Sequence, residues 1–186
     1  LIPGPTGIFP SSFPEKIITI VSGLPRTGTS VMMQMLAAGG LEPLSDGNRQ
    51  ADDSNPKGYY EYDKAPQLAS DNSWILDGQG KVVKIVAPIL PKLPVDQGEK
   101  YRIIFIERDL DEVHASQSSM LQRLGKEPSS ISPEKMKQSY LRLLGQVNSH
   151  LVGNGIRTIR VNYGDFVSSP LDQVEKLNRF CGGRLE

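Results

Sequence analysis

Short apolar runs rich in isoleucine and valine recur along this chain, and helix-like stretches separate most of them. The runs are Ile17–Ser22 (IITIVS), Lys81–Val86 (KVVKIV), Tyr101–Glu107 (YRIIFIE) and Ile156–Asn162 (IRTIRVN). Runs of this kind are typical of strands buried on both faces of a parallel sheet. Strands that alternate with helices are joined by right-handed crossovers and bind ligands at their carboxyl ends. The sequence therefore predicts a three-layer α/β/α fold with a mainly parallel central sheet.

The stretches between the runs carry helix signals. Expected helices cover residues 29–38, 65–77, 109–124 and 133–152, and Ser169 with Pro170 opens another as N-cap and first helical residue. Residues 1–14 hold four prolines and two glycines, which predicts an extended N-terminal arm. The stretch 44–66 is long, polar and irregular, and such a length in a compact domain is typical of a functional loop.

Composition favours one globular domain that spans residues 1–186, because a single core serves chains of up to roughly 200 residues. Lys plus Arg and Asp plus Glu are equal at 21 each, and no basic run stands out, so we expect no nucleic-acid partner. Cys181 is the single cysteine and is expected to pack in a helix. No apolar run approaches the roughly 18 residues of a membrane span, and the start of the sequence lacks the pattern of a signal peptide, so the expected location is cytoplasmic.

The segment Gly23–Ser30 (GLPRTGTS) stands between the first apolar run and the first expected helix. It almost matches the phosphate-loop pattern GxxxxGK[ST], but Thr29 stands where that pattern has lysine. Gly23 and Gly28 allow close backbone approach, and the amides and dipole of the following helix favour a phosphate or sulfate. Three readings stay open at this point: a triphosphatase loop without its lysine, a plain turn, and a loop for another anion, with Arg26 as its cation.

A second candidate for anion binding follows the third apolar run. Arg108 ends that run, and Ser116 lies eight residues further on, about two turns into the expected helix. Both side chains could face the same edge of the sheet and clamp a second phosphate. Glu107, just before Arg108, is the nearest candidate for the acidic residue that a magnesium-dependent triphosphatase requires.

Together these residues resemble a known family. The loop PRTGTS followed by Arg108 and Ser116 in RDLDEVHAS resembles the sulfotransferases that use 3′-phosphoadenosine 5′-phosphosulfate (PAPS). Weaker similarities are NPKGYYE (Asn55–Glu61), KIVAP (Lys84–Pro88) and VNYGDF (Val161–Phe166), so that the resemblance covers about residues 16–181. It implies a P-loop NTPase-like fold, PAPS as donor, no metal, and a loop cation at Arg26.

The resemblance also implies roles for single residues. Residues Thr27, Gly28, Thr29 and Ser30 would hold the 5′-phosphosulfate together with Arg26, while Arg108 and Ser116 would hold the 3′-phosphate. Lys84 would offset charge on the departing oxygen. Tyr163 and Trp74 could stack on adenine or simply pack in the core. The acceptor would be a hydroxyl or amine of a small molecule or a glycan.

Two departures from the family pattern affect the chemistry. Val86 stands where cytosolic members have the histidine base of their KTH motif, and valine accepts no proton. Other branches of the family use a glutamate near the sulfuryl group of the donor, so the resemblance implies Glu61 as the candidate base. The RKG motif that also holds the 3′-phosphate in those members is missing. A kinase-like nucleotide-binding protein and a non-catalytic PAPS-binding module remain alternatives. The acceptor pocket is expected from residues 44–66 and 121–152, and a second subunit could complete it. His114 and His150 are not expected to take part.

Overall fold

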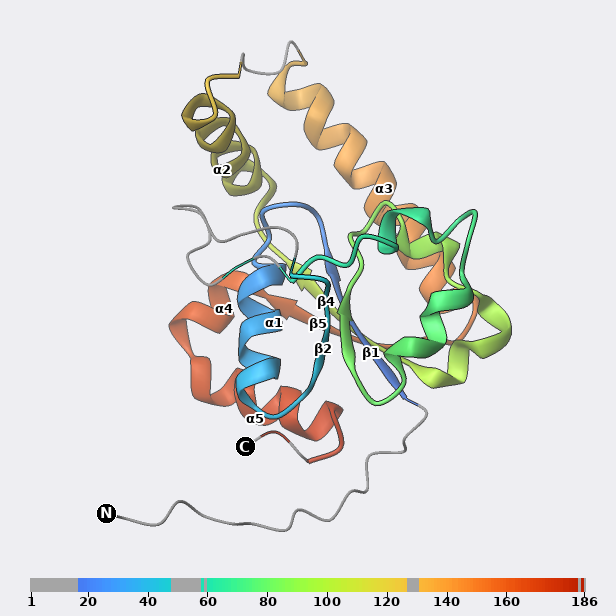
Figure 1. Ribbon diagram of the computed structural model, residues 1–186. Coiled ribbons are helices and arrows are strands. Elements are labelled where there is room, and N and C mark those ends of the chain that lie inside the picture. The colour runs from blue at the N-terminus through green and yellow to red at the C-terminus, as the bar shows by residue number, and fades with distance from the viewer. Residues whose placement is uncertain (1–16, 48–57, 59, 127–130, 184, 186) are drawn as a thin grey trace.

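The computed structural model describes residues 17–47, 58, 60–126, 131–183 and 185 (Figure 1). Two stretches lie outside these residues: the expected N-terminal extension 1–14 and most of the NPKGYYE segment. A five-stranded, all-parallel sheet forms the centre, in the order β2-β3-β1-β4-β5. The strands are β1 (Ile18–Gly23), β2 (Pro43–Leu44), β3 (Val82–Lys84), β4 (Tyr101–Glu107) and β5 (Arg157–Asn162). The predicted α/β fold with a parallel sheet is confirmed.

Helices cover both faces of this sheet. The α-helices are α1 (Thr29–Ala38), α2 (Leu110–Arg123), α3 (Pro133–Gly153), α4 (Tyr163–Ser168) and α5 (Pro170–Phe180). The 3-10 helices are η1 (Ala65–Gln67), η2 (Ser73–Gly78), η3 (Leu90–Lys92) and η4 (Val95–Lys100). One core cluster packs α1 and α5 against the sheet, and the other packs η2, η3 and α3 against it. Cys181 is buried in the first cluster, as expected, and burial raises the pKa of its thiol to about 11.

Sequence reasoning was wrong about the segment 65–77, which is not one helix. The structure has η1 and η2 there, with turns between them. Asp71 accepts hydrogen bonds from the backbone amide and the hydroxyl of Ser73, at 3.0 and 2.6 Å. These local side-chain bonds compete with the hydrogen bonds of an α-helix. The stretch of chain between η1 and η2 is therefore a polar turn.

The prediction that the run 156–162 is buried on both faces was also wrong. β5 is an edge strand, in which Val161 is buried while Arg157 and Arg160 are exposed. Helix α4, which was not predicted, follows this strand directly. Asn162 caps it by accepting bonds from the amides of Gly164 and Asp165, at 2.8 and 3.4 Å. Asparagine before a helix is a strong N-cap signal, so α4 could have been predicted from sequence.

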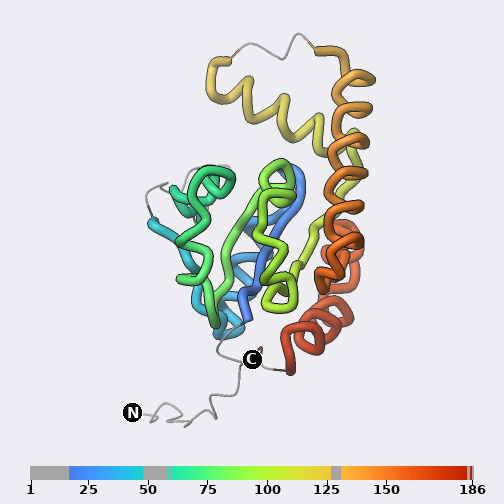
Figure 2. The backbone as a smooth tube through the Cα atoms, turned by 90° about the vertical axis from the view of Figure 1, so that its right-hand side faces the viewer, coloured from blue at the N-terminus to red at the C-terminus, as the bar shows by residue number. Residues whose placement is uncertain are grey.

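Helices α2 and α3 form a projecting arm. Figures 1 and 2 both place α2 above the edge at which the parallel strands end, while α3 runs from the far end of the arm down along the body. Both helices start with side-chain caps, Asp109 for α2 and Ser132 for α3. The arm therefore stands on the ligand-binding side that parallel α/β sheets share. No helix within the described residues is long and apolar enough to cross a membrane.

Candidate functional site

The β1–α1 loop has a backbone that only particular residues permit. Gly28 has φ +99°, and a Cβ atom on it would lie 2.6 Å from the Tyr163 ring, so glycine is required there. A Cβ atom on Gly23 would lie 2.7 Å from the carbonyl oxygen of Ile106. The hydroxyl of Thr27 donates to the carbonyl of Leu24 at 2.8 Å and closes the turn. The loop is thus held tightly between β1, β4 and α4.

Helix α1 begins at the open side of this loop. Gly28 occupies its N-cap position, and no side chain caps the helix. The amides of the first helical turn and the positive end of the helix dipole therefore face the space above the loop, as anion binding requires. Thr29 is buried and Ser30 is half-buried at this end. The predicted residues Thr27 to Ser30 thus form one strand-to-helix turn.

Lys84 supplies a cation from the neighbouring strand. It ends β3, opposite Val21 of β1, and its side chain is only 6% exposed. Its Nζ atom lies 3.5 Å from the Ser30 hydroxyl and 3.5 Å from Oε1 of Glu61, whose side chain is 42% exposed. A buried ammonium is stable only with such partners. The structure therefore brings together Ser30, Lys84 and Glu61, which sequence reasoning had taken from three separate segments.

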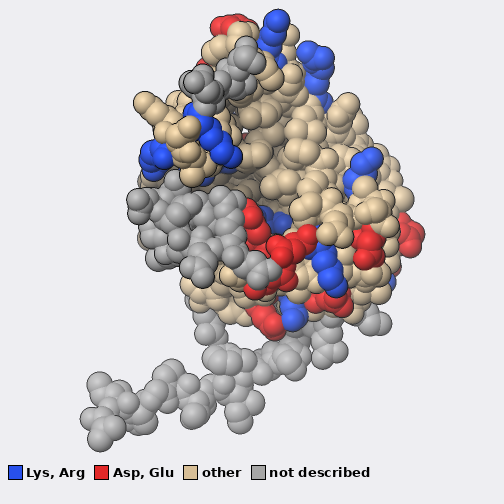
Figure 3. All heavy atoms as spheres, turned by 45° about the horizontal axis from the view of Figure 1, so that its top comes forward, with Lys and Arg blue, Asp and Glu red and all other residues tan. Residues whose placement is uncertain are grey.

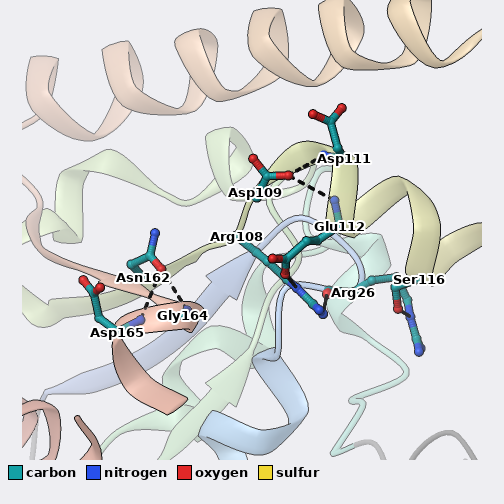
Figure 4. Close-up of polar contacts among 9 residues, drawn as sticks. All are labelled: Arg26, Arg108, Asp109, Asp111, Glu112, Ser116, Asn162, Gly164 and Asp165. Carbon is teal, nitrogen blue, oxygen red and sulfur yellow. Dashed lines mark hydrogen bonds and ion pairs between the residues drawn. The ribbon is translucent and has the colours of Figure 1, made fainter. Parts of the chain in front are cut away.

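Arg26, Arg108 and Ser116 meet on the other side of the loop (Figure 4). Arg26 adopts φ +71°, which is unusual for a residue with a side chain. Its Nε donates to the Ser116 hydroxyl at 3.2 Å, and its Nη1 lies 3.7 Å from the Met120 sulfur. Arg108 Nη1 donates to the carbonyl oxygen of Arg26 at 3.2 Å. The expected convergence of Arg108 and Ser116 is observed, with Arg26 between them.

Two further side chains fix the Arg108 guanidinium. Glu112 accepts a hydrogen bond from its Nε at 2.8 Å, and the ring of Tyr163 lies under its Cζ, 4.7 Å from the ring centroid. Asp109 caps α2 through the amides of Asp111 and Glu112 and so places Glu112 one turn after Arg108 (Figure 4). Sequence reasoning missed this role of Glu112, although its spacing of four residues from Arg108 was a signal; Arg108 itself lies just before the helix that contains Glu112.

An apolar pocket lies beside Tyr163. It is small, with a free volume of about 10 Å³, which is room for about one water molecule. Its walls come from α1, from the ends of β4 and β5, and from α4: Gly28, Val31, Met32, Ile106, Val161, Tyr163 and Phe166. The pocket adjoins the loop at Gly28.

Other residues considered from sequence lie elsewhere. Trp74 is buried in the core, and its ring centroid lies 5.1 Å from that of Tyr62. It therefore packs in the core and does not stack on a ligand. Glu107 was the candidate acidic residue for magnesium in a kinase-like protein. It is ion-paired with Arg160 and so already has a cationic partner. Val86 is half-buried, two residues beyond Lys84. Among the residues that the structure describes, no group of three or more His, Cys, Asp or Glu could hold a metal ion.

The space-filling view shows a hollow between the arm and the body (Figure 3). Lys and Arg atoms lie among other residues on the lobe at one side of it, and Asp and Glu atoms gather at its lower rim. The hollow opens at the edge of the sheet that carries the β1–α1 loop.

Comparison with solved structures identifies the architecture. The sulfotransferase from Alicyclobacillus acidocaldarius superposes with a TM-score of 0.56 at 16% identity, over 89% of this chain and 81% of that chain. A sulfotransferase from Mycobacterium tuberculosis H37Rv gives 0.56 at 17% identity, over 90% and 67%. The chain has the sulfotransferase fold. Retinol dehydratase, in complex with androsterone and inactive cofactor PAP, gives 0.50 at 12% identity, over 90% of this chain and 60% of that chain.

Comparison at the level of sequence adds nothing to this. No protein-family model matches the chain, and no curated protein matches its sequence. Identities of 12 to 17% establish a shared fold, while function depends on the residues of the site. The sulfotransferase fold nevertheless agrees with the motifs that predicted it.

Proposed function

We propose that the protein is a sulfotransferase that moves a sulfuryl group from PAPS to a hydroxyl or amine of a small-molecule or glycan acceptor. The observation that carries this proposal is the position of Lys84. A buried lysine from the strand next to the loop approaches Ser30 at the start of α1, so a cation is present although the loop has no lysine of its own. This arrangement suits a ligand that differs from a magnesium-bound triphosphate.

The charges around the loop support this choice of donor. Lys84 lies at the uncapped N-terminus of α1, and Arg26 and Arg108 lie in and beside the loop that leads into this helix, which suits a ligand with several anionic groups. Bound PAPS would supply an activated sulfuryl group joined to the 5′-phosphate. The amides of Thr27 to Ser30 and the Arg26 side chain would hold this end. Arg108 and Ser116 would hold the 3′-phosphate, and Tyr163 would line the place of the adenine.

Lys84 and Glu61 would carry the chemistry. Lys84 Nζ would neutralise negative charge that develops on the oxygen between phosphorus and sulfur, an electrostatic role that a buried ammonium performs well. Glu61 would accept the proton of the acceptor at its carboxylate, since Val86 cannot. The Lys84–Glu61 contact keeps both groups at one place before any ligand binds.

Ligand-dependent thermal stability tests the donor assignment. We expect 3′-phosphoadenosine 5′-phosphate (PAP) to stabilise the protein, by about 2.7 kcal/mol at a hundredfold excess over Kd, and ATP with magnesium to have little effect. Stabilisation by ATP and magnesium alone would overturn the proposal in favour of a kinase-like protein. Transfer of label from PAPS to a panel of hydroxyl and amine acceptors tests the reaction. Binding of PAP without any transfer would indicate the non-catalytic module.

A further inference from the structure

The segment Tyr60–Tyr62 crosses the edge of the sheet with its side chains fixed on opposite faces. Tyr60 packs against the core cluster that contains α1. Tyr62 packs against the other cluster, where its ring meets Trp74 edge to face, with 5.1 Å between centroids and 63° between planes. Glu61 stands between these two anchors and reaches Lys84. The two tyrosines thus prevent the segment from sliding toward either face.

The backbone of this segment is strained. Among the described residues with side chains, only Arg26 and Tyr60 have a positive φ, and that of Tyr60 is +52°. This conformation is a clear outlier for an aromatic residue and costs on the order of 1–3 kcal/mol. It persists only where surrounding contacts determine it. Both outliers flank the candidate site, one in the loop and one directly before Glu61.

Residues that follow β2 supply those contacts. The Ser45 hydroxyl donates to the carbonyl oxygen of Glu61 at 3.0 Å, and the Asp46 amide donates to the same oxygen at 3.2 Å. The amide of Asp63 donates to Oδ2 of Asp46. Ser45 directly follows Leu44, which pairs with Val83 next to Lys84. The backbone of Glu61 is therefore tied to the strand beside the lysine that its side chain meets.

We infer that Ser45 and Tyr62 are positioning residues that hold the Glu61 carboxylate at Lys84 before any ligand binds. Ser45 fixes the Glu61 backbone relative to the sheet, and Tyr62, through Trp74, fixes the direction of the chain. A catalytic group gains most when its geometry is set in advance, because small displacements cost large factors in rate. The kinetic part of this inference rests on the proposed function, in which Glu61 is the base.

The kinetic experiment compares Ser45→Ala with Ser45→Thr, which keeps the hydroxyl. Loss of one hydrogen bond predicts a kcat about fivefold lower for Ser45→Ala, with PAP affinity unchanged and with recovery in Ser45→Thr. Ser70→Ala is the matched control, because Ser70 makes a similar bond to the carbonyl of Gln67, at 3.0 Å, away from the site. Tyr62→Phe should remain close to wild type, and Tyr62→Ala should lose more activity than Ser45→Ala.

A double-mutant cycle separates positioning from general destabilisation. Glu61→Gln alone should lower kcat by on the order of a hundredfold or more. In that background Ser45→Ala should cause no further loss, because its effect passes through Glu61. An equal fivefold loss in both backgrounds would overturn the inference. Full activity of Glu61→Gln would instead remove Glu61 as base, which contradicts the proposed function.

Amine labelling of Lys84, followed by mass spectrometry, gives a readout that needs no sulfuryl transfer. The Glu61 carboxylate covers Nζ at 3.5 Å, so Glu61→Ala should raise the labelling rate. Ser45→Ala should raise it part of the way, and Ser45→Thr should not. A Ser45→Ala protein with wild-type labelling would overturn the positioning role whether or not the protein transfers sulfate. Labelling that changes as expected in a protein without transfer would contradict only the proposed reaction.

Discussion

The two sides of the β1–α1 loop hold their charges in different ways. On the β3 side, Lys84 is almost fully buried and lies within 3.5 Å of both Ser30 and Glu61. On the β4 side, Arg108 is partly exposed and is held by Glu112, by a backbone carbonyl and by a tyrosine ring. A buried charge interacts strongly with its neighbours, whereas a charge near solvent is screened. A buried cation with strong interactions suits a reacting centre, and a partly exposed, screened cation suits a binding subsite.

Replacement of Lys84 tests the buried side and should have the largest effect. Lys84→Ala removes the only cation placed at Ser30 by β3, and we expect kcat for sulfuryl transfer to fall by on the order of 10²–10³-fold, the usual cost of one electrostatic catalytic group. The PAP dissociation constant, measured by calorimetry, should change far less. Lys81→Ala is the matched control, because Lys81 lies at the other end of the strand and pairs with Glu42 near solvent. Equal loss in both variants would contradict the assignment.

Replacement of Arg108 tests the partly exposed side. Arg108→Ala should weaken PAP binding by roughly tenfold to a hundredfold, since charge-assisted bonds to phosphate contribute about 1.5–3 kcal/mol. Binding of adenosine 5′-phosphosulfate, which has no 3′-phosphate, should stay within a few fold. Arg160→Ala, in the adjacent strand β5, serves as the control. A similar loss for both ligands would show that Arg108 does not read the 3′-phosphate.

The β4 side of the site was open to prediction from sequence because its signals are local. Gly28, Arg108 and Ser116 lie in short motifs at the ends of strands, where register and helix periodicity determine direction. The parallel sheet followed from its apolar runs for the same reason. Those signals predicted that Arg108 and Ser116 face the same edge of the sheet. They did not predict that Arg26 lies between the two residues, which the structure shows through the hydrogen bonds among them.

The β3 side was harder, because its contacts join segments that have no common pattern. Nothing in the sequence around Ser45 indicates a bond to Glu61, sixteen residues away. The packing of Tyr62 on Trp74 depends on where η2 lies, and the segment 65–77 had been predicted as one continuous helix. The burial predicted for β5 was wrong for a similar reason, because the apolar residues of this strand do not reveal that it lies at the edge of the sheet. Such features come from tertiary arrangement rather than from local propensity.

Gly28 connects the two sides, and its replacement should have a smaller effect. In Gly28→Ala the new Cβ would be strained at φ +99° and would lie 2.6 Å from Tyr163, which supports Arg108. We expect a loss of about 2–3 kcal/mol in urea unfolding, together with weaker PAP binding. Gly40→Ala is the matched control, because Gly40 has φ +93° with nothing within 4 Å of a Cβ atom. If both variants lose equal stability, contact with Tyr163 contributes nothing.

The smallest effect should come from the charge of Glu112. Its ion pair with Arg108 is 59% exposed on the glutamate side, and such pairs contribute about 0–1 kcal/mol. Glu112→Gln keeps an oxygen that can accept from Arg108, so PAP affinity at physiological salt should stay within about threefold of wild type. Glu175→Gln, in the exposed pair with Arg179 on α5, controls for loss of a surface charge. An effect of Glu112→Gln as large as that of Arg108→Ala would show that the β4 side also depends on a strongly coupled ion pair, and the contrast between the two sides would then be wrong.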